Sequence, residues 1–152
     1  MSKRIIYSYL NDDELLRISN TIKEVEKKTS AEILVTIKEK RNFFEKRKSI
    51  KELAEKEFWK SGITSTKERT GVLIFILLSN KQFYILADKK ISEKIEQKFF
   101  DEIANSMSNS FHKGKYTQGI INCIISLSDI LSKHFPILPD DINEISNLVR
   151  IS

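Results

Sequence analysis

Oxygen-bearing side chains stand where the sequence predicts strands to begin or end. Asp88 follows one apolar run, Glu32 opens another, and a polar loop at 60–70 precedes a third. Calcium takes about six to eight oxygen ligands and magnesium about six, from carboxylates, carbonyls and water. The sequence therefore predicts a weak calcium or magnesium site built from four side chains: Glu32, Glu68, Thr70 and Asp88.

Two other interpretations of these residues stay open. In the simpler one, Glu32 and Asp88 are solvated ends of strands, while Thr29 and Ser30 form a turn. In the catalytic one, Asp88 is a weak candidate that holds a metal or acts with Glu32 as acid and base. The segment LADKK has no second acid two residues after its aspartate. An aspartyl-phosphate mechanism therefore has only weak support.

Three segments are expected to form the strands that bring these side chains together. Residues 31–38 alternate in the β-rich pattern of a strand, and the apolar runs 71–78 and 82–87 are joined by the short connection SNK. Such a connection demands an antiparallel hairpin, whereas a helix between the first two strands makes them a parallel pair. The starts of the parallel strands and the end of the third strand then share one edge of the sheet.

Helices with one apolar face are expected around these strands. Asn11 and Glu14 are spaced as a capping box, Gly62 is a stop signal after the second helix, and Ser92 is the expected cap of the third. Trp59 is expected to pack near the end of the second. The apolar positions recur at helical spacing in all three: Leu15, Ile18, Ile22 and Val25; Ile50, Leu53, Ala54 and Phe58; Ile95, Phe99 and Ile103.

These elements predict the α/β class, as a three-layer α/β/α sandwich with a small mixed sheet of a parallel pair plus an antiparallel hairpin strand. Residues 4–9 are expected to add an edge strand. A last helix, from Tyr116 to about His134, is apolar on most sides and must be largely buried. We expect one domain over residues 1–136, and an extended tail at 137–152 that packs on the domain or leaves it.

Composition narrows the class of protein. A content of 40% hydrophobic and 31% charged residues is typical of a compact globular chain. No apolar run is long enough to span a bilayer and no secretory signal is present, so a cytoplasmic monomer is expected. Without a Walker A or GxGxxG sequence, no nucleotide cofactor is expected. Cys123, within the apolar run IINCIISL, is expected to be buried and structural.

Basic residues are dense in only one stretch of this chain of net charge +5, residues 38–51. Arg41, Arg47 and Lys48 could grip a nucleic acid there while two phenylalanines stack on bases. The same periodicity fits the start of an amphipathic helix, so nucleic acid is not the expected partner. The stretch also follows the carboxyl end of the first strand, where open α/β sheets bind ligands, and its charge suits an anionic one.

Six short motifs, in their order and spacing, resemble the TPM domain family, which includes thylakoid lumen phosphatase-like proteins of photosystem II repair and many bacterial proteins. The resemblance covers about residues 11–145, and the DDINE segment is similar to the tail of a short bacterial subgroup. The motifs are TSAEILV at 29–35, GI at 62–63, TGVLIFIL at 70–77, FYILADKKI at 83–91, FHKGKYTQGI at 111–120 and HFP at 134–136.

The resemblance implies an α/β/α sandwich, together with the divalent-metal binding and acid phosphatase activity proposed for some relatives. The chain departs from the family at Thr70, where asparagine is usual, and at 87–90, where ADKK replaces a glycine-rich turn. Lysine in place of glycine restricts the backbone and adds positive charge beside a cation. We therefore favour a binding or accessory module with a weak cation site and an unknown protein partner, with a metal-dependent acid phosphatase as the alternative.

Overall fold

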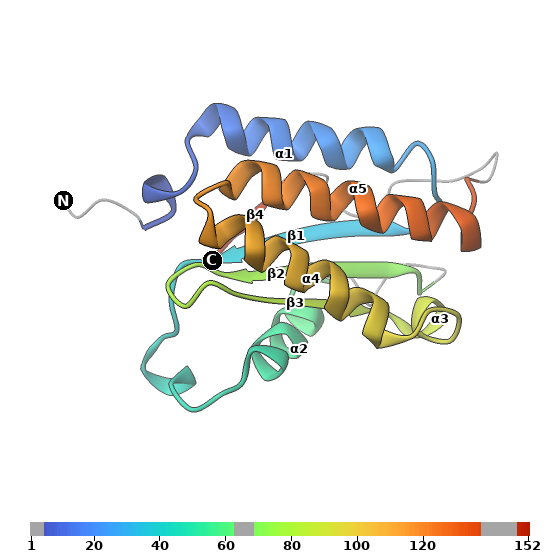
Figure 1. The fold of residues 1–152 in the computed structure, drawn as a ribbon. Coiled ribbons are helices and arrows are strands. Elements are labelled where there is room, and N and C mark those ends of the chain that lie inside the picture. The colour runs from blue at the N-terminus through green and yellow to red at the C-terminus, as the bar shows by residue number, and fades with distance from the viewer. Residues whose placement is uncertain (1–4, 63–68, 138–148) are drawn as a thin grey trace.

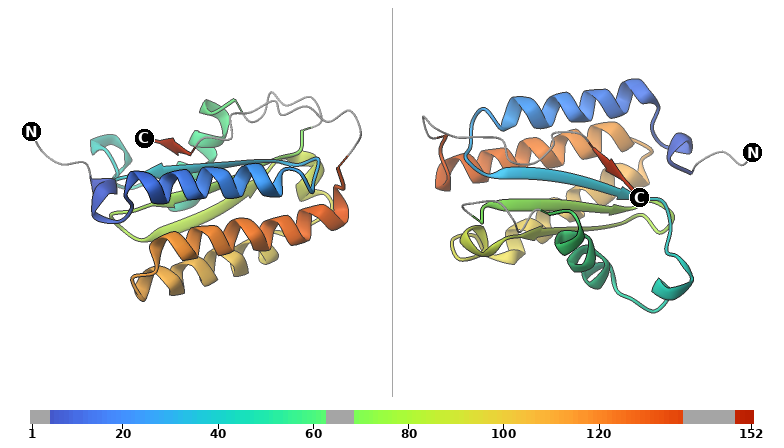
Figure 2. Two further views of the ribbon diagram at one scale, coloured as in Figure 1. Left: turned by 90° about the horizontal axis from the view of Figure 1, so that it is seen from above. Right: turned by 180° about the vertical axis from the view of Figure 1, so that it is seen from behind.

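The computed structural model of the protein describes residues 5–62, 69–137 and 149–152. In these residues two layers of helices enclose a sheet, so the predicted three-layer α/β/α sandwich is confirmed (Figure 1). Three long helices cover one face and one helix covers the other, as the two turned views also show (Figure 2). The three are α1 (Asp12–Val25), α4 (Gln97–His112) and α5 (Tyr116–His134), and the fourth is α2 (Ile50–Lys60).

The sheet is mixed, with the strand order β3-β2-β1-β4. β1 (Glu32–Lys38) and β2 (Gly71–Leu77) run parallel, because α2 returns the chain to its starting edge. β3 (Gln82–Ala87) pairs antiparallel with β2. The predicted parallel pair and hairpin strand are thus confirmed, and both inner strands are buried on both faces.

The predicted edge strand at residues 4–9 is wrong. Ile5–Ser8 forms a short 3-10 helix, η1, and the place beside β1 is taken by β4 (Arg150–Ile151), which runs parallel to it. Ile6 explains the difference, because its side chain is buried in the core while its N–H donates to Glu39 Oε2 at 2.8 Å. Most of the predicted tail, residues 138–148, lies outside the described residues, so its domain boundary stays a prediction.

The third predicted helix is in fact two helices. Asp88, and not Ser92, is the first cap: it precedes the short α3 (Lys89–Ser92), and α4 begins anew at Gln97. The break rotates the second piece relative to the predicted face, so Phe99 is exposed and Phe100 is buried instead. The buried side of α4 is Phe100, Ala104, Met107 and Phe111.

Two apolar clusters form the core, one on each face of the sheet. The larger lies under α1, α4 and α5, and the smaller lies under α2. The capping box of Asn11 and Glu14 is present at α1, and Cys123 is buried in α5, both as predicted. Trp59, expected to pack near the end of α2, is 69% exposed. Among the described residues, no helix has the length and apolar character needed to cross a membrane.

Candidate functional site

The first residues of β1 and β2 and the end of β3 meet at one edge of the sheet. The backbone N–H of Glu32 donates to the carbonyl of Thr70 at 3.0 Å, and that of Asp88 donates to Gly71 at 2.8 Å. The side chains of Glu32, Thr70 and Asp88 are all buried. The structure therefore brings three of the four predicted ligands to this edge, whereas Glu68 lies outside the described residues.

Asp88 is fully engaged with groups of the protein itself. Its Oδ2 accepts from Arg69 Nε at 2.7 Å and its Oδ1 from Arg69 Nη2 at 2.7 Å. Oδ1 also accepts from the backbone N–H of Lys89 at 2.7 Å, which caps α3. The carboxylate is 3% exposed, and its hydrogen bonds raise the pKa of the Arg69 guanidinium. The guanidinium thus takes the position in which a cation bound to Asp88 would lie.

Arg69 was missed in the sequence, where Lys89 and Lys90 were the positive charges noted beside Asp88. Those two lysines begin α3 with exposed side chains. Arg69 has a positive φ of 56°, a conformation that residues other than glycine adopt with strain. Its carbonyl also accepts from the N–H of Lys90 at 3.3 Å. The loop geometry that aims Arg69 at Asp88 depends on pairing between residues far apart in the chain.

A second acidic centre at the same edge combines Glu32 with Glu26, the residue after α1. Glu26 Oε2 accepts from the backbone N–H of Ile33 at 3.0 Å. Burial, together with the charge of Glu32 and a hydrogen bond between the two side chains, raises the pKa of Glu26 to about 8, although the hydrogen bond from Ile33 opposes the shift. At neutral pH the two carboxyl groups therefore share a proton. Sequence reasoning missed Glu26, although an acid at a helix C-terminus, which the helix dipole disfavours, was a usable signal.

The two hydroxyl residues before β1 stabilise the end of α5. Thr29 Oγ1 donates to the carbonyl of Phe135 at 2.5 Å, and the N–H of Ser30 donates to the same carbonyl at 2.9 Å. Thr29 also forms an isolated antiparallel bridge with Pro136. These contacts join the TSAEILV and HFP segments, so here the two residues act as a structural turn.

The acidic groups at this edge form two separate centres. Glu32 and Asp88 lie on either side of β2, two strand spacings or roughly 10 Å apart in their backbones. Asp88 is balanced by Arg69, and Glu32 is coupled to Glu26. Within residues 5–62, 69–137 and 149–152, no three Asp, Glu, His or Cys side chains lie close enough to hold a metal together. Any cation site here would need backbone, hydroxyl or water oxygens as well.

The opposite edge carries the basic stretch. Arg41 donates from Nε and Nη2 to the carbonyl of Lys48, from Nη1 to Asn80 Oδ1 at 2.9 Å, and from Nη2 to Gln82 Oε1 at 3.2 Å. Arg41, predicted as a nucleic-acid ligand, is therefore used to tie the loop to the β2–β3 turn. Arg47 and Lys48 have exposed side chains.

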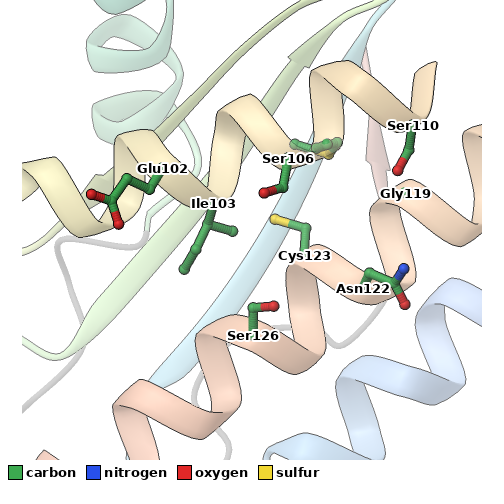
Figure 3. Close-up of a pocket in the computed structure, with 9 residues that line it drawn as sticks. Glu102, Ile103, Ser106, Ser110, Gly119, Asn122, Cys123 and Ser126 are labelled. Carbon is green, nitrogen blue, oxygen red and sulfur yellow. The ribbon is translucent and has the colours of Figure 1, made fainter. Parts of the chain in front are cut away.

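A groove of about 290 Å³ lies between α4 and α5, and Figure 3 shows the polar and apolar side chains that line it. Gly119 lets the helices approach, since a Cβ there would lie 2.8 Å from Ser110 Cβ. Burial raises the pKa of the Cys123 thiol to about 12, so it stays protonated and is no nucleophile. The groove is lined by Glu102, Ile103, Ser106, Met107, Ser110, Gly119, Asn122, Cys123 and Ser126.

Comparison with known proteins adds a family and two structures. The family model described as TPM domain matches residues 7–130. The chain is similar to the BA42 protein of the psychrophilic bacterium Bizionia argentinensis, with 29% identity, a TM-score of 0.84, and coverage of 95% of this chain and 96% of that one. The N-terminal domain of a P. gingivalis protein shares the fold at 12% identity and a TM-score of 0.68, over 84% of this chain and 79% of that one. No functionally curated protein matches the sequence.

Proposed function

The chain belongs to the TPM domain family, and from that premise we propose that it is a binding module with a weak divalent-cation site at the Glu26–Glu32 pair. The observation that carries the proposal is that the carboxyl groups of Glu26 and Glu32 interact at the start of β1, each with a buried oxygen atom. Burial of negative charge without compensation is unfavourable. A divalent cation would supply the compensation in place of the shared proton.

Asp88 is not part of the proposed site. Both of its carboxylate oxygens already accept hydrogen bonds from Arg69, and the ion pair neutralises its charge. A cation bound there would have to displace a guanidinium held at two points. Of the residues predicted from the sequence, Glu32, Thr70 and Glu68 stay candidate ligands, and Glu26 joins them.

Calcium or magnesium fits the donor set, and binding should be weak. Two carboxylates offer at most four oxygen atoms, and Glu26 Oε2 already accepts from Ile33. Calcium needs about six to eight oxygen ligands, so backbone, hydroxyl or water oxygens must complete the shell. Sites of low ligand charge bind calcium with dissociation constants of roughly 0.1–1 mM.

An NMR titration tests this proposal. Calcium and magnesium added separately to about 20 mM should shift the amide signals of Glu32, Ile33 and Gly71 in a saturable way, given the weak affinity expected. The Glu26→Gln and Glu32→Gln variants should lose these shifts. Asp88→Asn is the matched control: it removes an acid at the same edge that lies outside the proposed site, and it should keep the shifts. The proposal fails if the wild-type signals do not move, or if Glu32→Gln titrates like the wild type.

The acid phosphatase alternative stays a prediction based on the family resemblance. In it Asp88 holds a metal or acts with Glu32 as acid and base, yet both oxygens of Asp88 are engaged with Arg69 and with the first turn of α3. Hydrolysis of p-nitrophenyl phosphate, abolished in a folded Asp88→Asn variant, would revive it.

A further inference from the structure

Two adjacent phenylalanines are exposed at the end of a projecting loop. Phe43 is 75% exposed and Phe44 is 85% exposed, and both belong to the 3-10 helix η2 (Phe43–Glu45). Figure 1 shows the loop around η2 extending beyond the layered body, and the view from behind in Figure 2 shows the same. We call Phe43 and Phe44 the aromatic tip. Adjacent exposed apolar side chains of this size commonly mark a contact surface.

The backbone of the aromatic tip is held in place by a capping box. The N–H of Asn42 donates to Glu45 Oε1 at 2.9 Å, and the N–H of Phe44 donates to Asn42 Oδ1 at 2.9 Å. The Glu45 carboxylate is buried beneath the tip, where it forms ion pairs with Lys38 at 3.3 Å and Lys56 at 3.4 Å. These contacts turn the one acid of η2 inward and leave the two rings outside.

Arg41 fixes the base of the same loop. Its guanidinium joins the carbonyl of Lys48 to the side chains of Asn80 and Gln82, so both ends of the loop are tied to the β2–β3 turn. The exposure of the tip therefore follows from a hydrogen-bonded loop that presents the rings. A preformed surface loses less conformational entropy on binding than a flexible one.

The surroundings of the tip are basic. Lys46 Nζ lies 5.1 Å from the centre of the Phe43 ring, a cation–π contact. Further basic side chains before and after the tip are exposed to solvent. They are Lys40, Arg47, Lys48 and Lys51.

We propose that the aromatic tip docks on an anionic lipid bilayer, with its two rings in the interfacial region and the surrounding lysines and arginine at the headgroups. Aromatic side chains partition into the membrane interface, and basic residues nearby are attracted to anionic lipids. The combination of an apolar tip and a basic surround fits this partner in both shape and charge. The surface lies at the opposite edge of the sheet from Glu26 and Glu32, so this proposal goes beyond the cation site and is independent of it.

A nucleic acid fits the same surface less well. The two rings meet edge to face, with an interplanar angle of 87°, whereas stacked bases need open ring faces. One face of Phe43 is covered by Lys46, and the guanidinium of Arg41 already donates hydrogen bonds to Lys48 and Asn80.

Co-sedimentation of the full chain with vesicles tests the proposal. Vesicles of phosphatidylcholine with phosphatidylserine should bind the protein in the presence of EDTA, and pure phosphatidylcholine should bind it far less. The double variant Phe43→Ser, Phe44→Ser should lose about tenfold or more in vesicle affinity, because two large apolar side chains no longer leave water. The matched control is Trp59→Ser, which removes an exposed aromatic from α2 and should bind like the wild type.

A spectroscopic readout separates insertion from simple charge attraction. Trp59 is the only tryptophan, so Phe44→Trp in a Trp59→Phe background reports on the tip alone. Its emission should shift to the blue with anionic vesicles, and about 0.5 M salt should weaken the binding. No vesicle binding, binding that survives loss of both phenylalanines, or no blue shift would each overturn the proposal. If the protein does not bind vesicles, two other results would also overturn the proposal. They are salt-sensitive binding to an oligonucleotide and self-association that requires Phe43 and Phe44.

Discussion

Arg69 and Asp88 form an ion pair with two parallel hydrogen bonds, each 2.7 Å long, at the edge of the sheet where β2 begins and β3 ends. Asp88 is also the cap of α3 and donates its own N–H to Gly71, so one residue closes the hairpin, starts a helix and holds an arginine. Asp88, the candidate catalytic residue predicted from the sequence, therefore has a structural role in joining β3, α3 and Arg69.

Loss of Arg69 should destabilise the folded protein more than loss of the Asp88 charge that it balances. Arg69→Ala leaves the buried carboxylate of Asp88 without its guanidinium, which is the costly way to break a buried pair. Asp88→Asn keeps an oxygen for the α3 cap and leaves Arg69 in solvent. We expect Arg69→Ala to lower the melting temperature by at least about 3 °C more than Asp88→Asn does.

The double variant Arg69→Ala, Asp88→Asn provides the control for this prediction. It should melt near Asp88→Asn alone, because the buried charge is gone in both. Equal and additive losses in the two single variants would show that the ion pair contributes little to the fold.

Close packing of α4 on α5 should make Gly119 intolerant of a side chain. A methyl group there would meet Ser110 Cβ, an atom fixed to its own backbone, at 2.8 Å. Gly119→Ala should therefore lower the free energy of unfolding by about 1–3 kcal/mol, as overpacking does, although alanine favours helices. Urea denaturation measures the change.

Ser110→Gly supplies the rescue, since it removes the atom that clashes. Introduced into the Ser110→Gly background, Gly119→Ala should cost nothing or stabilise the chain, because only the helix propensity of alanine remains. A Gly119→Ala variant as stable as the wild type would mean that the two helices can move apart at no cost.

The sequence determined the strands and their edge well, because alternation and short connections are local signals. The SNK connection sufficed to predict the β2–β3 hairpin, and this hairpin returns Asp88 to the start of β2. The interaction partners of Asp88 and Glu32 could not be predicted in this way, because they are not sequence neighbours of these acids. Arg69 lies 19 residues from Asp88, and Glu26 meets Glu32 only because α1 ends beside β1. The predicted cap Ser92 is instead the last residue of α3, because the Asp88 side chain accepts from the N–H of Lys89 and starts that helix four residues earlier.

The Glu26–Glu32 pair should make the protein less stable as the pH rises from about 5 to about 8. Glu26 has a pKa of about 8 in the folded protein against an ordinary value of 4.5, because burial and Glu32 disfavour its charged form. A raised pKa means that the folded state holds a proton that the unfolded state has lost within this window. The resulting stabilisation is complete below about pH 4.5 and disappears as the pH passes through about 8. With allowance for solvent screening, we expect a loss of about 1–2 kcal/mol, measured by urea denaturation without divalent cations. Glu26→Gln, which cannot ionise, should flatten this part of the profile, and an unchanged slope in that variant would show that another group is responsible.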